Sequence, residues 1–145
     1  MKAVIQRVAR ASVTVSGSQV SQIENGLLIL LGIGPDDNEE KAAAMTKKIA
    51  ALRIFEDDAD KMNLSVRDVN GSAIVVSQFT LYADCRKGNR PSFIGAAAPS
   101  LASPLVDRFA ELLTDQGVPT QTGIFGAHMD VELLNSGPVT IILEM

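Results

Sequence analysis

The chain has 145 residues, of which 46% are hydrophobic and 21% charged, as in a single globular domain. Its one cysteine excludes an intramolecular disulfide, and its net charge of −4 argues, taken alone, against binding nucleic-acid phosphates. The longest strongly apolar stretch, GLLILLGIG, is too short to cross a bilayer, and Arg7 and Arg10 interrupt the N-terminal stretch that would have to be apolar in a signal peptide. We therefore expect one domain over residues 1–145, cytoplasmic and without a membrane partner.

The first third of the chain predicts strands followed by a helix. Alternation of apolar and polar residues predicts strands over 2–9 and 11–16, and turn residues frame a short strand, QVSQI. The run LLILLGI, residues 27–33, has the composition of a strand buried on both faces. A helix follows because residues 36–38 offer capping side chains. We expect its buried stripe to consist of Ala42, Met45, Ile49 and Leu52.

The rest of the chain predicts more strands and a second helix. RIFED predicts a strand, and DVNGSAIVVSQFTLYA predicts a hairpin-like turn followed by a long strand. The second helix begins either at Ser103 and Pro104 or near Pro99 with a kink, and Gly117 and Pro119 end it. Its expected buried residues are Leu105, Phe109, Leu112 and Leu113. Further strands are expected over 119–125, over 128–134 and in the closing VTIILEM.

These elements predict an α+β domain with a mainly antiparallel or barrel-like sheet and about two helices. The last strand is apolar on both faces, and two helices are too few to cover a sheet of this size. We therefore expect a homodimer in which a second subunit covers the remainder.

Polar residues at the end of one predicted strand suggest a site. Alternation places Gln78 and Thr80 on one face with Tyr82, and Ser77 and Phe79 on the other. A buried hydroxyl or amide without a partner costs about 1–3 kcal/mol. These polar side chains therefore need either a hydrogen-bond network or a ligand.

Other patterns offer weaker candidates for chemistry. Cys85 and His128 invite interpretation as a Cys–His hydrolase, and Ser77, His128 and Asp130 would make a Ser–His–Asp triad, but no local signature supports either. GIGPDD lacks the spacing and lysine of a phosphate-binding loop. No spacing of possible ligands predicts a metal site.

Two loops remain to be interpreted. CRKGNRPSF carries Arg86, Lys87 and Arg90, which are either solvated or in contact with an anionic partner. NSGPVT, with Gly137 and Pro138 at its centre, predicts a turn between two apolar strands.

SQFTLYAD and NSGPVT, with the opening IQRVxRASVTV and the segment MNLSVRDVNGSAIVVSQFTL, closely resemble the D-aminoacyl-tRNA deacylases. The resemblance runs along essentially the whole chain with its motifs in register. It implies a homodimer with its active sites at the interface and aminoacyl-tRNA, bound by its 3′ end, as substrate. The implied reaction hydrolyses the ester of D-aminoacyl-tRNA, and of glycine mischarged on tRNA for alanine, and no cofactor is expected.

The resemblance also implies roles for the SQFT residues. The backbone amides of Phe79 and Thr80 would polarise the ester carbonyl, while Ser77 and Gln78 would shape the pocket. The tRNA's own 2′-hydroxyl would activate water, although Thr80 is an alternative nucleophile by residue type. His128, Cys85 and Ser136 match positions expected to vary in the family.

For chirality, the resemblance implies a cis Gly137-Pro138 peptide that inserts from the partner subunit and collides with an L side chain. Arg7 would donate to a carbonyl of this motif. Phe125 and Met129 would line the adenosine pocket and the carbonyl of Ala102 would seat the amino group; packing in the core is the alternative for these three. The resemblance to a tRNA-acting family makes Arg86, Lys87 and Arg90 the expected phosphate contacts.

Two rival functions remain. One is a small-molecule esterase or peptidase that uses Cys85 and His128, and the other is a non-catalytic RNA-binding dimer.

Overall fold

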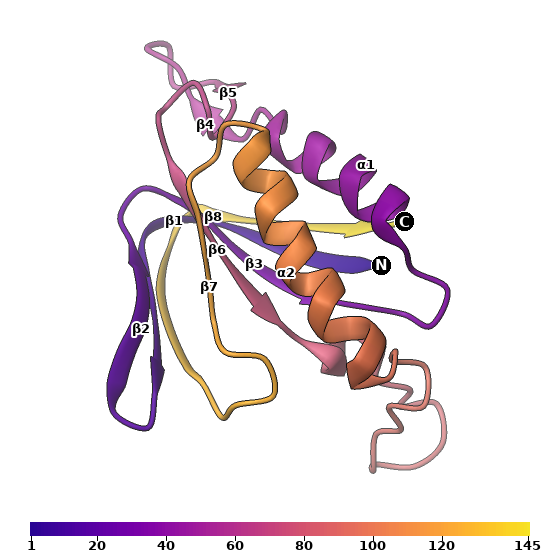
Figure 1. Ribbon diagram of the computed structural model, residues 1–145. Helices are drawn as coiled ribbons and strands as arrows, with labels where there is room; N and C mark the ends of the chain where they lie inside the picture. The colour runs from indigo at the N-terminus through magenta and orange to yellow at the C-terminus, as the bar shows by residue number, and fades with distance from the viewer.

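One long strand, β1 (Lys2–Val15), lies at the centre of the sheet in this computed structural model, which describes all 145 residues. Along one edge β1 pairs antiparallel with β8 (Asp130–Glu144). Along the other it pairs antiparallel with β3 (Gly26–Gly32) through its first half and with β2 (Ser18–Ile23) through its second half. Because β1 changes partner halfway, the sheet curls toward a barrel (Figure 1). The predicted α+β class with a mainly antiparallel, barrel-like sheet is confirmed.

Beyond β3 the sheet becomes parallel. β6 (Ser72–Ser77) pairs with β3, and β7 (Thr120–Thr122) pairs with β6, both in parallel. Parallel neighbours need long crossover connections, which here contain the two helices. A turn does precede β6, at residues 66–70, but it forms no hairpin, so the hairpin-like part of that prediction was wrong. The small hairpin of β4 (Phe55–Glu56) and β5 (Met62–Leu64) forms a separate sheet.

Both helices lie on the same face of the sheet (Figure 1). α1 (Glu39–Ala50) begins after Asn38, whose side chain accepts a hydrogen bond from the amide of Lys41 at 3.0 Å. α2 (Pro99–Asp115) begins at Pro99 and contains Pro104, so the earlier of the two predicted starts is the correct one. The predicted stripes are buried, except that Leu52 and Leu112 are only half-buried.

Several strand boundaries differ from the prediction. The segments 2–9 and 11–16 form one strand, β1, and the segments 128–134 and 139–145 are joined into one strand, β8. The strand predicted over 119–125 is limited to β7. No helix is both long and apolar enough to span a membrane.

The two faces of the sheet are covered unequally. The face under the helices contributes to a core cluster of 24 buried residues, and the opposite face to a cluster of seven. On that second face Ile142 of β8 is 73% exposed, and it pairs with the half-buried Val4 of β1. This apolar surface lies on the strands and not on the helices.

Candidate active site

The strand β6 ends at Ser77, earlier than the sequence predicts. Residues Phe79–Tyr82 form a 3₁₀ turn, η1, so the predicted alternation through Gln78, Thr80 and Tyr82 was wrong. The amide of Gln78 still donates to the carbonyl of Leu31 at 2.8 Å, and the first bond of the turn runs from Leu81 N to Gln78 O at 3.2 Å. The amides of Phe79 and Thr80 precede that bond and therefore have no acceptor within the turn.

A cavity of about 400 Å³ lies between this turn and the beginning of α2. Nine of its thirteen lining residues are hydrophobic, which suits a ligand held by apolar contact and a few polar groups. The lining residues are Leu31, Ile33, Ser77, Gln78, Phe79, Phe93, Ala96, Ala97, Pro99, Ala102, Val106, Phe125 and Gly126. The cavity thus brings together five of the predicted site residues, from β6, η1, α2 and the loop after β7.

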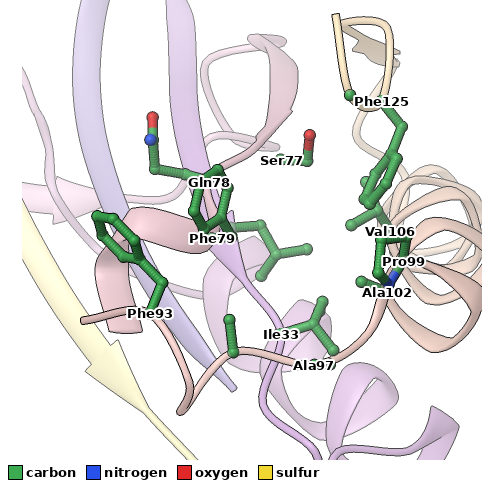
Figure 2. Close-up of a pocket in the computed structure, with 13 residues that line it drawn as sticks. Ile33, Ser77, Gln78, Phe79, Phe93, Ala97, Pro99, Ala102, Val106 and Phe125 are labelled. Carbon is green, nitrogen blue, oxygen red and sulfur yellow. The ribbon is translucent and has the colours of Figure 1, made fainter. Parts of the chain in front are cut away.

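Aromatic rings flank the cavity. Phe79 is 58% exposed and packs edge-to-face against Phe93, with ring centroids 5.1 Å apart and planes at 75°. Figure 2 shows Phe125 on the side of the cavity opposite Phe79. Met129 lines an adjoining depression of about 260 Å³, which it shares with Phe79. The sequence did not single out Phe93, although it lies directly after the basic loop.

Two of the three polar side chains of this segment, those of Gln78 and Thr80, bond to each other. The side-chain amide of Gln78, which is half-buried, donates to the hydroxyl of the exposed Thr80. Thr80 does not line the cavity. The hydroxyl of Thr80 is therefore engaged with Gln78, and its hydrogen bonds include none with a general base.

The second group of predicted residues surrounds an irregularity in β8. Gln6 pairs with Thr140 and Val8 pairs with Asn135, so residues 136–139 bulge out opposite the single residue Arg7. The Gly137-Pro138 peptide bond is cis, Gly137 has a φ of +121°, and both residues are exposed.

Arg7 ties this bulge to the core. Its buried guanidinium donates from Nε to Ser136 O at 3.0 Å, from Nη1 to Ile54 O at 2.8 Å and from Nη2 to Glu56 Oε1 at 3.3 Å. A planar guanidinium is suited to three separated acceptors because its donors point in fixed directions.

Asn135, which the sequence analysis did not single out, closes the base of the bulge. Its Oδ1 accepts from Val139 N at 3.1 Å, and its Nδ2 donates to Thr140 Oγ1 at 3.0 Å. An asparagine just before a Ser-Gly-Pro turn is a recognisable signal, because its side chain bonds readily to nearby backbone. Neither Gly137 nor Pro138 lines the cavity of its own chain.

The rival nucleophiles are poorly placed. His128 is 95% exposed at its side chain, and its Nε2 lies 3.8 Å from Oδ1 of Asp130, which is also exposed. Cys85 lines an open depression beside Tyr82, whereas His128 lines the depression beside Met129. A triad needs an oriented histidine, and this one is not held.

Comparison with known proteins identifies the family. Residues 4–144 match the family model described as D-Tyr-tRNA(Tyr) deacylase. The chain is 60% identical to the D-aminoacyl-tRNA deacylase of Thermomicrobium roseum and 58% identical to that of Geobacter sulfurreducens, over 99% of this chain and 94% and 95% of the relatives.

Two solved structures share the fold of this chain. The structure described as c-Myc DNA Unwinding Element Binding Protein superposes with a TM-score of 0.92 at 44% identity, covering 100% of this chain and 99% of the other. A probable eukaryotic D-amino acid tRNA deacylase shares the fold, with a TM-score of 0.85 at 16% identity over 99% and 98% of the chains. The chain therefore belongs to the D-aminoacyl-tRNA deacylase family and is an ester hydrolase that acts on D-aminoacyl-tRNA.

Proposed function

We propose that the protein proofreads chirality in the cytoplasm, removing D-amino acids from tRNA and glycine from tRNA for alanine while sparing L-aminoacyl-tRNA. Each active site combines the cavity of one protomer with the Gly137-Pro138 bulge of the other. One observation carries this proposal. Within one chain the cavity is open, and the exposed bulge, although firmly held by Arg7, does not line it.

The chemistry requires little from side chains. An aminoacyl ester is already activated, so holding its carbonyl against the amides of Phe79 and Thr80 lowers the barrier as negative charge develops on oxygen. Ser77 and Gln78 shape the cavity, and the 2′-hydroxyl of the terminal ribose positions the attacking water. The engagement of the Thr80 hydroxyl by Gln78 disfavours that hydroxyl as nucleophile.

Main-chain atoms provide the selection. The carbonyls of the partner's bulge stand where an L side chain would project, whereas a D side chain points away and glycine has none. In the cavity, the backbone carbonyl of Ala102 seats the amino group, and Phe125 and Met129 contact the terminal adenosine.

The sheet face that carries Val4 and Ile142 is the proposed dimer surface, because it leaves apolar area exposed in one chain. A heterodimer of Gly137→Ala with Ala102→Phe tests the shared site. If the sites are shared, one site receives an intact cavity and an intact bulge, and about half of the normal D-specific activity returns. If each protomer is self-sufficient, both sites stay defective.

The basic loop is the proposed contact for tRNA phosphates. Arg86 donates from Nε to Asp84 Oδ1 at 2.9 Å and from Nη2 to Asp84 Oδ2 at 2.6 Å, and these bonds hold the loop. Lys87 and Arg90, by contrast, pair with no carboxylate. These three cations line one open depression, just before Phe93 at the cavity.

Substitution of Lys87 and Arg90 by alanine tests this contact. We expect KM for aminoacyl-tRNA to rise and the slope of log KM against log salt to fall by about 1 per phosphate lost. The matched control replaces Lys47 and Lys48, exposed cations on α1, and should leave both quantities unchanged. Equal effects of the two pairs would mean that the loop has no special role.

The central experiment offers the purified protein D-Tyr-tRNA, L-Tyr-tRNA, glycyl-tRNA for alanine and a free D-tyrosine ester. We expect rapid hydrolysis of the first and third, little of the second, and slow hydrolysis of the free ester. Cys85→Ala and His128→Ala should not alter these rates. If either substitution abolished hydrolysis, the rival esterase would be favoured. Binding of charged tRNA without hydrolysis would indicate the rival RNA-binding dimer.

A further inference from the structure

Tyr82 is the last residue of η1, and its ring fills space at the end of β3. A Cβ added at Gly32 would lie 3.2 Å from Cε2 of Tyr82, and one added at Gly34 would lie 2.7 Å from its hydroxyl. The ammonium of Lys2 lies 4.9 Å from the ring centroid, within cation–π distance. The ring is therefore fitted against the sheet at positions where the neighbouring residues have no side chain.

Asp37 binds the hydroxyl of Tyr82. Its buried carboxylate accepts from Gly34 N at 2.7 Å and Tyr82 Oη at 3.4 Å through Oδ2, and from the Met1 ammonium at 2.6 Å through Oδ1. Burial and the nearby Asp37 carboxylate raise the pKa of Tyr82 to about 12, so its hydroxyl remains protonated and able to donate.

We propose that Tyr82 and Asp37 are positioning residues for the deacylation, which fix η1 and thereby the amides of Phe79 and Thr80. The turn has four residues: the Gln78 amide fixes its start on Leu31, and Tyr82 fixes its end. Phe79 and Thr80, between these two points, are exposed. The proposal rests on the proposed role of those two amides in holding the ester carbonyl.

Variants at Tyr82 separate positioning from general stability. Tyr82→Leu removes the ring, and a displacement of catalytic groups by about 1 Å costs about 100-fold in rate, so we expect kcat on D-Tyr-tRNA to fall by about that factor. KM should change much less than kcat, because Phe79 is the only one of the thirteen lining residues that belongs to η1. Tyr82→Phe keeps the ring and loses only a long hydrogen bond, and it should retain most of kcat. The control Ile49→Ala, at a buried position of α1 that does not line the cavity, should lower stability and leave kcat unchanged.

A second-site rescue provides the sharper test. Gly34→Ala should lower kcat, because the new Cβ would displace the hydroxyl of Tyr82. The double variant Gly34→Ala with Tyr82→Phe should recover part of the kcat lost in Gly34→Ala, because the contact at 2.7 Å is then absent while Cζ of the ring, at 3.0 Å, stays close. Asp37→Asn should lower kcat in the same direction as Tyr82→Leu, since the carboxylate holds both Gly34 and Tyr82.

Three outcomes would overturn the proposal: an unchanged kcat for folded Tyr82→Leu, an equal fall for Ile49→Ala, or no recovery in the double variant. Failure of the proposed function itself would be seen in the wild-type protein, as hydrolysis of D- and L-Tyr-tRNA at equal rates. The two failures are thus distinguishable.

Discussion

Arg7 Nε donates a hydrogen bond to the carbonyl oxygen of Ser136 across 3.0 Å, joining the central strand to the bulge of β8. The same guanidinium reaches Ile54 O and Glu56 Oε1, so one buried side chain holds three separate segments. The bulge is therefore held as part of the core although its tip is exposed.

Arg7→Lys should weaken both the fold and the selection against L substrates. A single ammonium cannot match three acceptors in the geometry of the guanidinium, so we expect a loss of about 2 kcal/mol in the free energy of unfolding. The ratio of D-Tyr-tRNA to L-Tyr-tRNA hydrolysis should fall by about tenfold or more, as expected for about 1.4 kcal/mol of lost discrimination. Urea unfolding and initial rates measure these effects. Arg53→Lys, at an exposed arginine bonded to Asn63, is the control and should preserve the ratio.

Gly137→Ala should deform the bulge. Its φ of +121° is unfavourable for any L residue with a side chain, and the new Cβ would lie 2.6 Å from Arg7 Nη2. We expect the rate of D-Tyr-tRNA hydrolysis, relative to that of L-Tyr-tRNA, to fall by about tenfold or more, because displacing a group in an active site by about 1 Å can lower the rate by about 100-fold. Gly17→Ala is the matched control, since Gly17 also has a positive φ but nothing within 4 Å of its added Cβ. Retention of full selectivity by Gly137→Ala would argue against the bulge as the selecting element.

Phe125→Ala should weaken binding of the tRNA 3′ end without impairing the chemical step. Stacking of a base on an aromatic ring contributes about 1–3 kcal/mol, so KM should rise by about 10- to 100-fold. kcat should change little, because the ring contacts the adenosine and not the ester. Ile124→Ala, at a partly exposed neighbour that does not line the cavity, should leave KM unchanged in the same steady-state assay.

Asp37 should make the free energy of unfolding depend on pH in the acidic range. Burial acts to raise the pKa of Asp37, but hydrogen bonds from the Met1 ammonium, Gly34 N and Lys41 outweigh it and hold the pKa below its ordinary value. Because the pKa of Asp37 is lower in the folded than in the unfolded state, its carboxylate adds to the free energy of unfolding at pH values above the unfolded pKa of about 3.9. This contribution is lost as the pH falls below that value. Asp37→Asn should therefore be less stable than wild type by about 3 kcal/mol near neutrality, as for a broken buried ion pair.

This difference between Asp37→Asn and wild type should narrow as urea unfolding is repeated at lower pH. Asp57, Asp68 and Asp84 also have lowered pKa values, so the total acid sensitivity of the wild type is composite. The comparison with Asp37→Asn isolates the contribution of Asp37. A difference that stays constant down to about pH 2 would contradict the assignment.

Local patterns predicted the elements well where one face or both faces of a strand are buried. The buried strand β3 and the helix α1 follow directly from apolar runs, spacing and the Asn38 cap. The end of β6 at Ser77 could not be predicted, because the residues from Gln78 to Tyr82 continue to alternate. The packing of Tyr82 against Gly32 and Gly34, about fifty positions earlier in the chain, was also invisible to local pattern.

The site was predicted in two parts for different reasons. Single-sequence patterns indicated that Ser77, Gln78 and Thr80 needed partners, but assigned the Gly137-Pro138 segment only to a turn; its proposed role came from family resemblance. Asp37 and Tyr82 escaped notice because their contact joins residues 45 positions apart. The parallel pairing of β6 with β3 and β7 likewise depends on where the helices pack and not on the strands themselves.

β1 carries Lys2 beside the ring of Tyr82 and Arg7 beneath the bulge, five positions apart along one strand. An extended chain rises by about 3.3 Å per residue, so about 17 Å of straight backbone separates these two points. In the proposed dimer the first point supports a protomer's own catalytic centre and the second supports its neighbour's. A single strand would therefore contact the supports of both active sites of the proposed dimer, so a substitution within β1 could affect both sites at once.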